Sequence, residues 1–149
     1  MRLIRRIHEG FSKVLGGGHS AAGPEAPQVP PHLRDGTLAE RLAETWLSRQ
    51  GLKVIARNVR CKLGEIDLVA TDGEMLVFVE VRMRTDPRFG GAAASITPAK
   101  QAKLVRAAEW FLANGGKAWA GRPCRFDVVL LDRLHLAHIE WIRGAFDAY

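Results

Sequence analysis

The sequence predicts one α/β domain in which helices cover a central mixed β-sheet. At 149 residues the chain is long enough for one domain of ordinary size and too short for two. Two segments with helical periodicity alternate with strand-like runs in the order helix, three strands, helix, two strands. The composition, 47% hydrophobic and 26% charged, is typical of a cytosolic globular protein, so we expect a cytoplasmic location.

The predicted domain occupies residues 36–149 and follows a basic tail at residues 1–35. Residues 1–15 can form a short amphipathic helix, but arginines interrupt the apolar core that a signal peptide needs. Residues 16–31 are rich in Gly, Ala and Pro and are typical of a flexible linker. The longest apolar runs are only a few residues, so we expect no membrane span.

The first helix is predicted to begin at Thr37 and to end at Gly51. Thr37 with Glu40 three residues later has the pattern of a capping box, and Gly51 is a C-terminal stop signal. The predicted apolar stripe is Leu38, Leu42, Trp46 and Leu47.

Strand patterns occur at 53–60, 65–71, 75–82, 125–131 and 136–142. Asp72-Gly73 is a strong hairpin signal between the second and third of these. The second helix begins with Thr97 as N-cap and Pro98 at the first helical position, and it ends at Gly115-Gly116. Its predicted core residues are Leu104, Ala107, Ala108, Trp110, Phe111 and Leu112.

A two-residue turn at Asp72-Gly73 predicts the faces of the hairpin, because side chains alternate along a strand. In this pairing Glu65 lies roughly opposite Glu80, with Asp67 diagonal to it. One face carries Glu65, Asp67, Phe78, Glu80 and Arg82. The other face, which is uniformly apolar and must face the core, carries Ile66, Leu68, Val77, Val79 and Val81.

Carboxylates this close repel one another unless a divalent cation, Arg82 or water compensates them. Carboxylate oxygens suit a hard cation such as Mg²⁺ or Mn²⁺, which also coordinates phosphate and can generate a hydroxide nucleophile. The alternative is a solvated hairpin face on which the acids pair with Arg82.

The run GEIDLVA followed by LVFVEVR resembles the D…(D/E)xK motif of restriction-endonuclease-like nucleases. More closely, the chain resembles the bacterial YraN-like family of predicted endonuclease-like proteins, related in fold to archaeal Holliday junction resolvases. The resemblance covers about residues 36–147. Besides the hairpin it includes Arg57-Asn58, Phe89-Gly90, Lys100 and Arg125-Phe126-Asp127.

This resemblance implies a restriction-endonuclease-like core with Asp67, Glu80 and Arg82 at the catalytic site. Asp67 and Glu80 would be metal ligands, and Glu40 a third one, although a capping box also accounts for Glu40. The chain departs from the motif at Arg82, where these nucleases have a lysine that is thought to orient or deprotonate the attacking water. Arginine effectively cannot lose its proton. Relatives that cut both strands are often dimers, so a homodimer stays open.

The net charge of +6 favours a polyanionic partner, and the predicted partner is nucleic acid, in particular DNA. Arg82, Arg84 and Lys100 are the residues that we expect to hold its phosphates. The leading hypothesis is a DNA-binding, endonuclease-like protein that acts on branched or otherwise structured DNA. The alternatives are a non-catalytic DNA-binding module with a degenerate nuclease site and a protein-interaction adaptor that keeps the fold.

Overall fold

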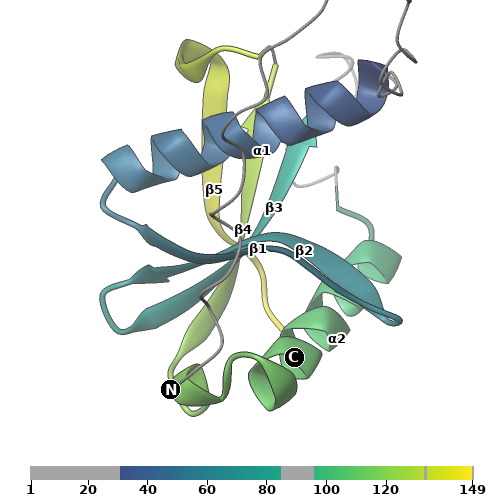
Figure 1. Cartoon of the computed structure of the whole chain (residues 1–149), viewed down its shortest axis with the longest axis vertical. Coiled ribbons are helices and arrows are strands. Elements are labelled where there is room, and N and C mark those ends of the chain that lie inside the picture. Colours follow the sequence, from purple (N-terminus) through teal and green to yellow (C-terminus); the bar gives the residue numbers. More distant parts are fainter. Residues whose placement is uncertain (1–30, 85–95, 133, 149) are drawn as a thin grey trace, which may run out of the picture.

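The computed structural model describes residues 31–84, 96–132 and 134–148, with side chains from Gly36 onward. These residues form a five-stranded mixed β-sheet with a long helix on each face, which confirms the predicted α/β class (Figure 1). The predictions for residues 1–30 and for Thr85–Ser95, including Phe89-Gly90, lie outside the described residues.

The main elements follow the predicted order. They are α1 (Pro31–Arg49), β1 (Lys53–Cys61), β2 (Gly64–Asp72), β3 (Met75–Met83), α2 (Pro98–Asn114), β4 (Cys124–Leu131) and β5 (Ile139–Phe146). Short 3-10 turns lie at Lys117–Trp119 and Leu136–His138. The strands lie side by side in chain order, and all neighbours are antiparallel except β3 and β4, which are parallel and joined through α2.

Helix α1 begins at Pro31, six residues before Thr37, so the predicted capping box is wrong. Proline is tolerated in the first turn of a helix, because the N–H that it lacks has no partner there in any case. The predicted end is confirmed: Gly51 has a φ of +94°, and the N–H of Leu52 donates to the carbonyl of Leu47. The division into a tail and a domain stays a prediction.

The face of α1 against the sheet differs from the predicted stripe at Leu38, whereas Leu42 and Trp46 are partly buried against the core as predicted. Its buried residues are Ala39, Ala43 and Leu47, whereas Leu38 is 44% exposed. Two alanines at helical spacing let the helix lie close to the strands. These residues pack with Leu68, Ala70, Val77, Val79, Val129 and Leu131.

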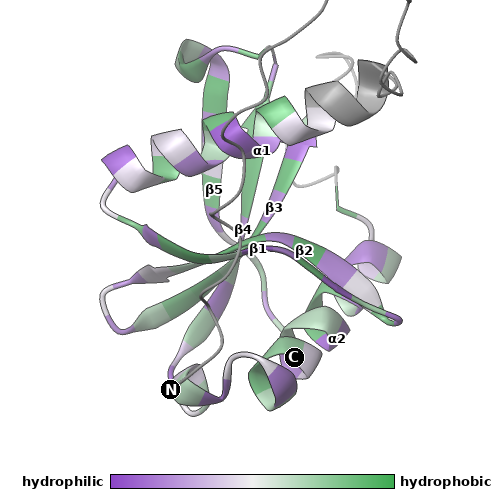
Figure 2. Ribbon diagram, in the orientation of Figure 1, coloured by the Kyte–Doolittle hydropathy of each residue, from purple (hydrophilic) through white to green (hydrophobic). Residues whose placement is uncertain are grey.

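The opposite face of the sheet packs against α2. Four of its predicted core residues are buried, namely Leu104, Ala107, Ala108 and Phe111. Trp110 is 40% exposed, so its predicted place in the core is wrong. The sheet is therefore covered on both faces, and Figure 2 shows hydrophobic residues concentrated along the central strands.

The β2–β3 hairpin is shifted by two residues from the predicted pairing, because Phe78 lies opposite Val69 and not Asp67. The turn consists of Gly73 and Glu74, and Gly73 takes a φ of +58°, which glycine adopts without steric cost. A shift of two keeps every side chain of a regular ladder on its predicted face.

The ladder between β2 and β3 ends at Leu68 opposite Val79. Beyond it, the carboxylate of Asp67 accepts the N–H of Val81, and regular pairing stops. Ile66 then packs with Val69 and the α2 side of the core, so its predicted place beside Leu68 is wrong.

The last strand begins three residues later than predicted. Residues Leu136–His138 form a 3-10 turn in which His135 Nδ1 accepts the N–H of Ala137 at 3.1 Å. In β5 the pairing with β4 is interrupted opposite Asp127. Asp127 is only 1% exposed, and its oxygens accept hydrogen bonds from Trp141 Nε1 and Gly144 N. These contacts give Asp127 a structural role in the sheet.

Candidate functional site

Asp67, which is partly buried, and Glu80, which is buried, form a carboxylate pair at the point where β2 and β3 separate. They lie one position beyond the last residues of the ladder, Leu68 and Val79, and the charge of Glu80 raises the pKa of Asp67. Asp67 Oδ2 accepts the backbone N–H of Val81 at 2.7 Å, and Glu80 is 6% exposed. The shifted register places Asp67, and not Glu65, at the position that would lie opposite Glu80 if the ladder continued.

The two carboxylate oxygens of Glu80 differ in their partners. Its Oε1 lies 3.0 Å from Nζ of Lys100, which reaches it from the first turn of α2. Its Oε2 is buried and has no hydrogen-bond partner within the described residues. A buried carboxylate oxygen without a partner is costly, so this atom is suited to a ligand that brings positive charge.

Lys100 is held in position by the cap of α2. Thr97 is the N-cap, and its Oγ1 accepts the backbone N–H of Lys100 at 3.2 Å, as predicted for this helix start. From this position the side chain of Lys100 reaches Glu80 on the face of the sheet that α2 covers. A cation at this end of a helix is disfavoured by the macrodipole, so the carboxylate of Glu80 is what stabilises it.

Both carboxyl groups resist ionisation. Burial, together with the charge of Glu80, raises the pKa of Asp67 to about 7, while the hydrogen bond from Val81 opposes this. Burial also raises the pKa of Glu80, and the ammonium of Lys100 and the charge of Arg82 offset part of that rise. An added cation would remove both penalties, and two carboxylates are suitable ligands for a hard divalent ion.

The other predicted site residues lie around this pair at different distances. Glu40, in the middle of α1, is near enough for its charge to raise the pKa of Asp67 further. Within the described residues, however, no group of three or more Asp, Glu, His or Cys side chains is arranged to hold a metal ion. Glu65 is exposed and pairs with Arg60 at 3.4 Å.

The predicted phosphate-binding arginines differ from one another. Arg82, two residues after Glu80 on β3, is close enough to lower the pKa of that carboxyl. Arg84 forms ion pairs with Asp132 at 3.2 Å and with Glu140 at 2.5 Å.

Sequence reasoning gave Lys100 a phosphate-binding role but missed its ion pair with Glu80. The signal was present in one respect: a lysine in the first turn of a helix is out of keeping with the macrodipole. Only the crossing of α2 over the sheet reveals which acid it contacts. Lys62 and Lys103, which lie on the same side of the molecule as Lys100, were not singled out as a group.

Comparison with known proteins identifies the family. The model of the family described as "Uncharacterised protein family UPF0102" matches residues 39–131, a range that contains Asp67, Glu80 and Lys100. A UPF0102 protein from Methylobacillus flagellatus is 57% identical over 110 residues, which are 74% of this chain and 94% of that protein. Another from Nitrosomonas eutropha is 52% identical over 112 residues, 75% of this chain and 92% of that protein.

A more distant relative from Pseudomonas fluorescens, also described as a UPF0102 protein, is 48% identical over 117 residues. These residues are 78% of this chain and 96% of that protein. None of the described helices is both long and apolar enough to cross a membrane. From the match to the family model and these identities we conclude that the chain belongs to the uncharacterised protein family UPF0102, the YraN-like family that its sequence resembles.

Proposed function

We propose that the protein binds DNA at the carboxylate pair and hydrolyses phosphodiester bonds there with Mg²⁺ or Mn²⁺. The observation that carries this proposal is the pairing of the partly buried Asp67 with the buried Glu80, whose Oε2 has no hydrogen-bond partner among the described residues. Burying two acids side by side destabilises a fold unless something compensates their charge. A divalent cation bound between the two carboxylates would compensate their charge.

Asp67 and Glu80 are the residues that would hold the cation. Their donor atoms are all oxygens, which Mg²⁺ and Mn²⁺ prefer. The cation would supply a hydroxide nucleophile and stabilise charge on the scissile phosphate. Glu40 remains a candidate third ligand, which would have to approach from α1.

Lys100 could take the role of the motif lysine that is replaced by Arg82 in this chain. The nucleases that this chain resembles carry a lysine two residues after the glutamate, and here that position is Arg82. Lys100 brings a lysine to the same glutamate from α2, at 3.0 Å from Oε1. We propose that Lys100 orients the attacking water and that Arg82 holds a phosphate oxygen, because a guanidinium binds phosphate well but does not give up its proton.

A second candidate function is DNA binding without hydrolysis. The specific observation in its favour is Arg82, the substitution that the nuclease motif does not allow for. In that case the carboxylate pair would be a remnant, and binding would depend on salt but not on metal. A protein-interaction adaptor is a weaker candidate, because the net charge of +6 favours a polyanionic partner.

Calorimetric titration of Mn²⁺ tests the proposal. The wild type is compared with Asp67→Asn/Glu80→Gln and with a control, Glu74→Gln/Asp147→Asn, which removes two exposed acids elsewhere. We expect binding to the wild type and the control and none to the first variant. Cleavage of branched and linear DNA should then require Mn²⁺ or Mg²⁺ and both carboxylates.

Two results would count against the proposal. If Mn²⁺ binds neither the free wild type nor its DNA complex, the metal site does not exist. If DNA binds in the presence of EDTA but is never cut, the non-catalytic module becomes the function.

A further inference from the structure

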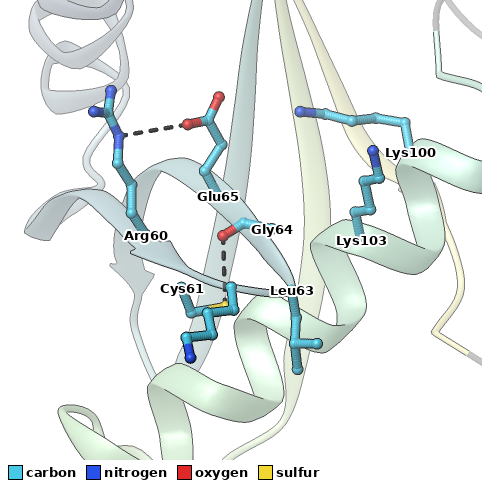
Figure 3. Close-up of a pocket in the computed structure, with 8 residues that line it drawn as sticks. Arg60, Cys61, Leu63, Gly64, Glu65, Lys100 and Lys103 are labelled. Carbon is cyan, nitrogen blue, oxygen red and sulfur yellow. Dashed lines mark hydrogen bonds and ion pairs between the residues drawn. The ribbon is translucent and has the colours of Figure 1, made fainter.

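A basic cleft of about 400 Å³ lies between the β1–β2 turn and the first turns of α2 (Figure 3). Its volume is in the range of ligand-binding pockets. Figure 3 shows Lys100 and Lys103 projecting from α2, with Arg60 and Glu65 on the strands across from them. Lys62 completes the group of charged residues that line it.

The walls of the basic cleft are fixed by a close contact between backbones. At Gly64, where β2 begins, a Cβ atom would lie only 2.6 Å from the carbonyl oxygen of Lys103. Only glycine allows this approach without displacement of α2. The β1–β2 turn and α2 are therefore in direct backbone contact, and this contact fixes the two walls of the cleft relative to each other.

The charge of the basic cleft is strongly unbalanced. Its lining has four cationic side chains and one carboxylate, that of Glu65. Arg60 pairs with Glu65 at 3.4 Å, and Lys100 pairs with Glu80 outside the lining. Within the described residues, no carboxylate pairs with Lys62 or Lys103. Cations gathered in this way repel one another and raise the local concentration of anions.

The basic cleft adjoins the carboxylate pair, and Lys100 connects the two. Its side chain lines the cleft and places Nζ 3.0 Å from Glu80. Glu65, on the opposite wall, is also near enough to affect the pKa of Glu80. A chain of phosphates that passes the carboxylate pair would therefore continue into the cleft.

We propose that the basic cleft binds the phosphodiester backbone of a nucleic-acid strand, at the phosphates next to the one held at Asp67 and Glu80. The orientation of the strand rests on the proposed function, whereas the binding itself does not. None of the lining residues is aromatic, so bases have no stacking partner there. The contacts are with phosphate, mostly without reading the sequence.

The test compares DNA binding by two double variants that remove equal charge. Lys62→Ala/Lys103→Ala removes the two cleft lysines that have no carboxylate partner among the described residues. Lys53→Ala/Lys117→Ala removes two exposed lysines, from the start of β1 and from the turn after α2. Fluorescence anisotropy with a labelled oligonucleotide is measured in EDTA at several salt concentrations, so that neither metal binding nor cleavage contributes.

Loss of two phosphate contacts should weaken binding by about tenfold or more and reduce the slope of log K against log salt by about 1.4–1.8. We expect this for the cleft variant and a clearly smaller effect for the control. Equal losses in the two variants, or no loss in either, would overturn the proposal. So would tighter binding of inorganic triphosphate than of the oligonucleotide, because the ligand would then be a small polyphosphate.

Two further measurements separate this proposal from the proposed function. The cleft variant should keep Mn²⁺ binding if the metal site exists, and Asp67→Asn/Glu80→Gln should keep cleft-dependent DNA binding. Mn²⁺ binding can therefore fail while the cleft proposal stands, and the cleft variant can bind DNA normally while the metal site stands.

Discussion

Lys100 Nζ lies 3.0 Å from Glu80 Oε1, although one residue begins a helix and the other lies near the end of a buried strand. The strand and the helix follow one another in the crossover from β3 to β4. This ion pair joins the carboxylate pair to the basic cleft. Its removal should therefore affect stability, ionisation and DNA binding together.

Lys100→Met should destabilise the protein by about 1–3 kcal/mol, because it leaves the buried carboxylate of Glu80 without its cation. The pKa of Glu80 should rise further above its ordinary value, since Lys100 is the largest influence that lowers it. Denaturant unfolding at pH 7 measures the first effect. Lys103→Met, which removes an exposed lysine from the same helix, is the control and should change stability much less.

Lys100 should also be required for cleavage if the proposed function is correct. Lys100→Arg keeps a charge near Glu80 but supplies a group that does not release its proton. We expect this variant to bind DNA nearly as well as the wild type and to cut it at a small fraction of the rate. Full activity of Lys100→Arg would remove Lys100 from the proposed role at the attacking water.

Asp67→Asn should stabilise the protein at neutral pH in the absence of metal. The folded pKa of Asp67 is about 7 and the unfolded value is near 4, so ionisation of this partly buried acid opposes folding. The penalty is absent below about pH 4, grows as the pH rises, and is complete above about pH 7. The gain on substitution, on the order of 1–3 kcal/mol, should follow that course in thermal unfolding. A gain that does not change with pH would contradict this explanation.

Mn²⁺ affinity should increase with pH up to about 7, because the metal binds the ionised form of Asp67. Below that pH, each unit should lower the affinity by roughly tenfold for each proton released. Calorimetry in buffers with different ionisation enthalpies counts the protons released. Affinity that is constant from pH 5 to pH 8 would mean that Asp67 is not a ligand.

Asp127→Ala should destabilise the fold by about 3–5 kcal/mol, because it leaves several donors without their acceptor. Asp127 accepts hydrogen bonds from Arg125 Nε at 3.0 Å, Trp141 Nε1 at 3.0 Å and Gly144 N at 2.9 Å. Denaturant unfolding measures the loss. Asp147→Ala, an exposed acid just after β5, should cost far less.

Gly64→Ala should destabilise the protein by about 1–3 kcal/mol, because its Cβ would meet the Lys103 carbonyl oxygen at 2.6 Å. Gly36→Ala is the opposite case. It lies in helix α1, where an added Cβ would have no atom within 4 Å beyond its chain neighbours and the helix's own backbone, and alanine is the better helix former there. Thermal unfolding of the two variants should therefore move in opposite directions.

The sequence by itself predicted the fold class, because each element carries its own local signal. Thr97 and Pro98 mark the start of α2, Gly51 ends α1, and the apolar periods identify helices and strands. Errors arose where a local signal had a competitor. Thr37 and Glu40 have the pattern of a cap, but the helix continues through them from Pro31.

Within the regular ladder the faces of the hairpin were predictable for the same reason, since alternation survives a register shift of two residues, and Ile66, beyond the ladder, is the exception. The register shift itself was not predictable. Asp72-Gly73 and Gly73-Glu74 could each form the two-residue turn, because strands of suitable length flank both of them. The shift places Asp67, and not Glu65, at the position that would lie opposite Glu80 if the ladder continued. The tertiary structure alone also shows that both faces of the hairpin are buried, one against α1 and the other against α2.

Sequence alone thus determined which acids lie on one face of the hairpin, and the tertiary structure decided what surrounds them. The helix α2 covers that face, which raises the pKa of both carboxyl groups and brings Lys100 to Glu80. The basic cleft depends in addition on the contact between Gly64 and Lys103. Such contacts join elements that are distant along the chain, and no local pattern encodes them.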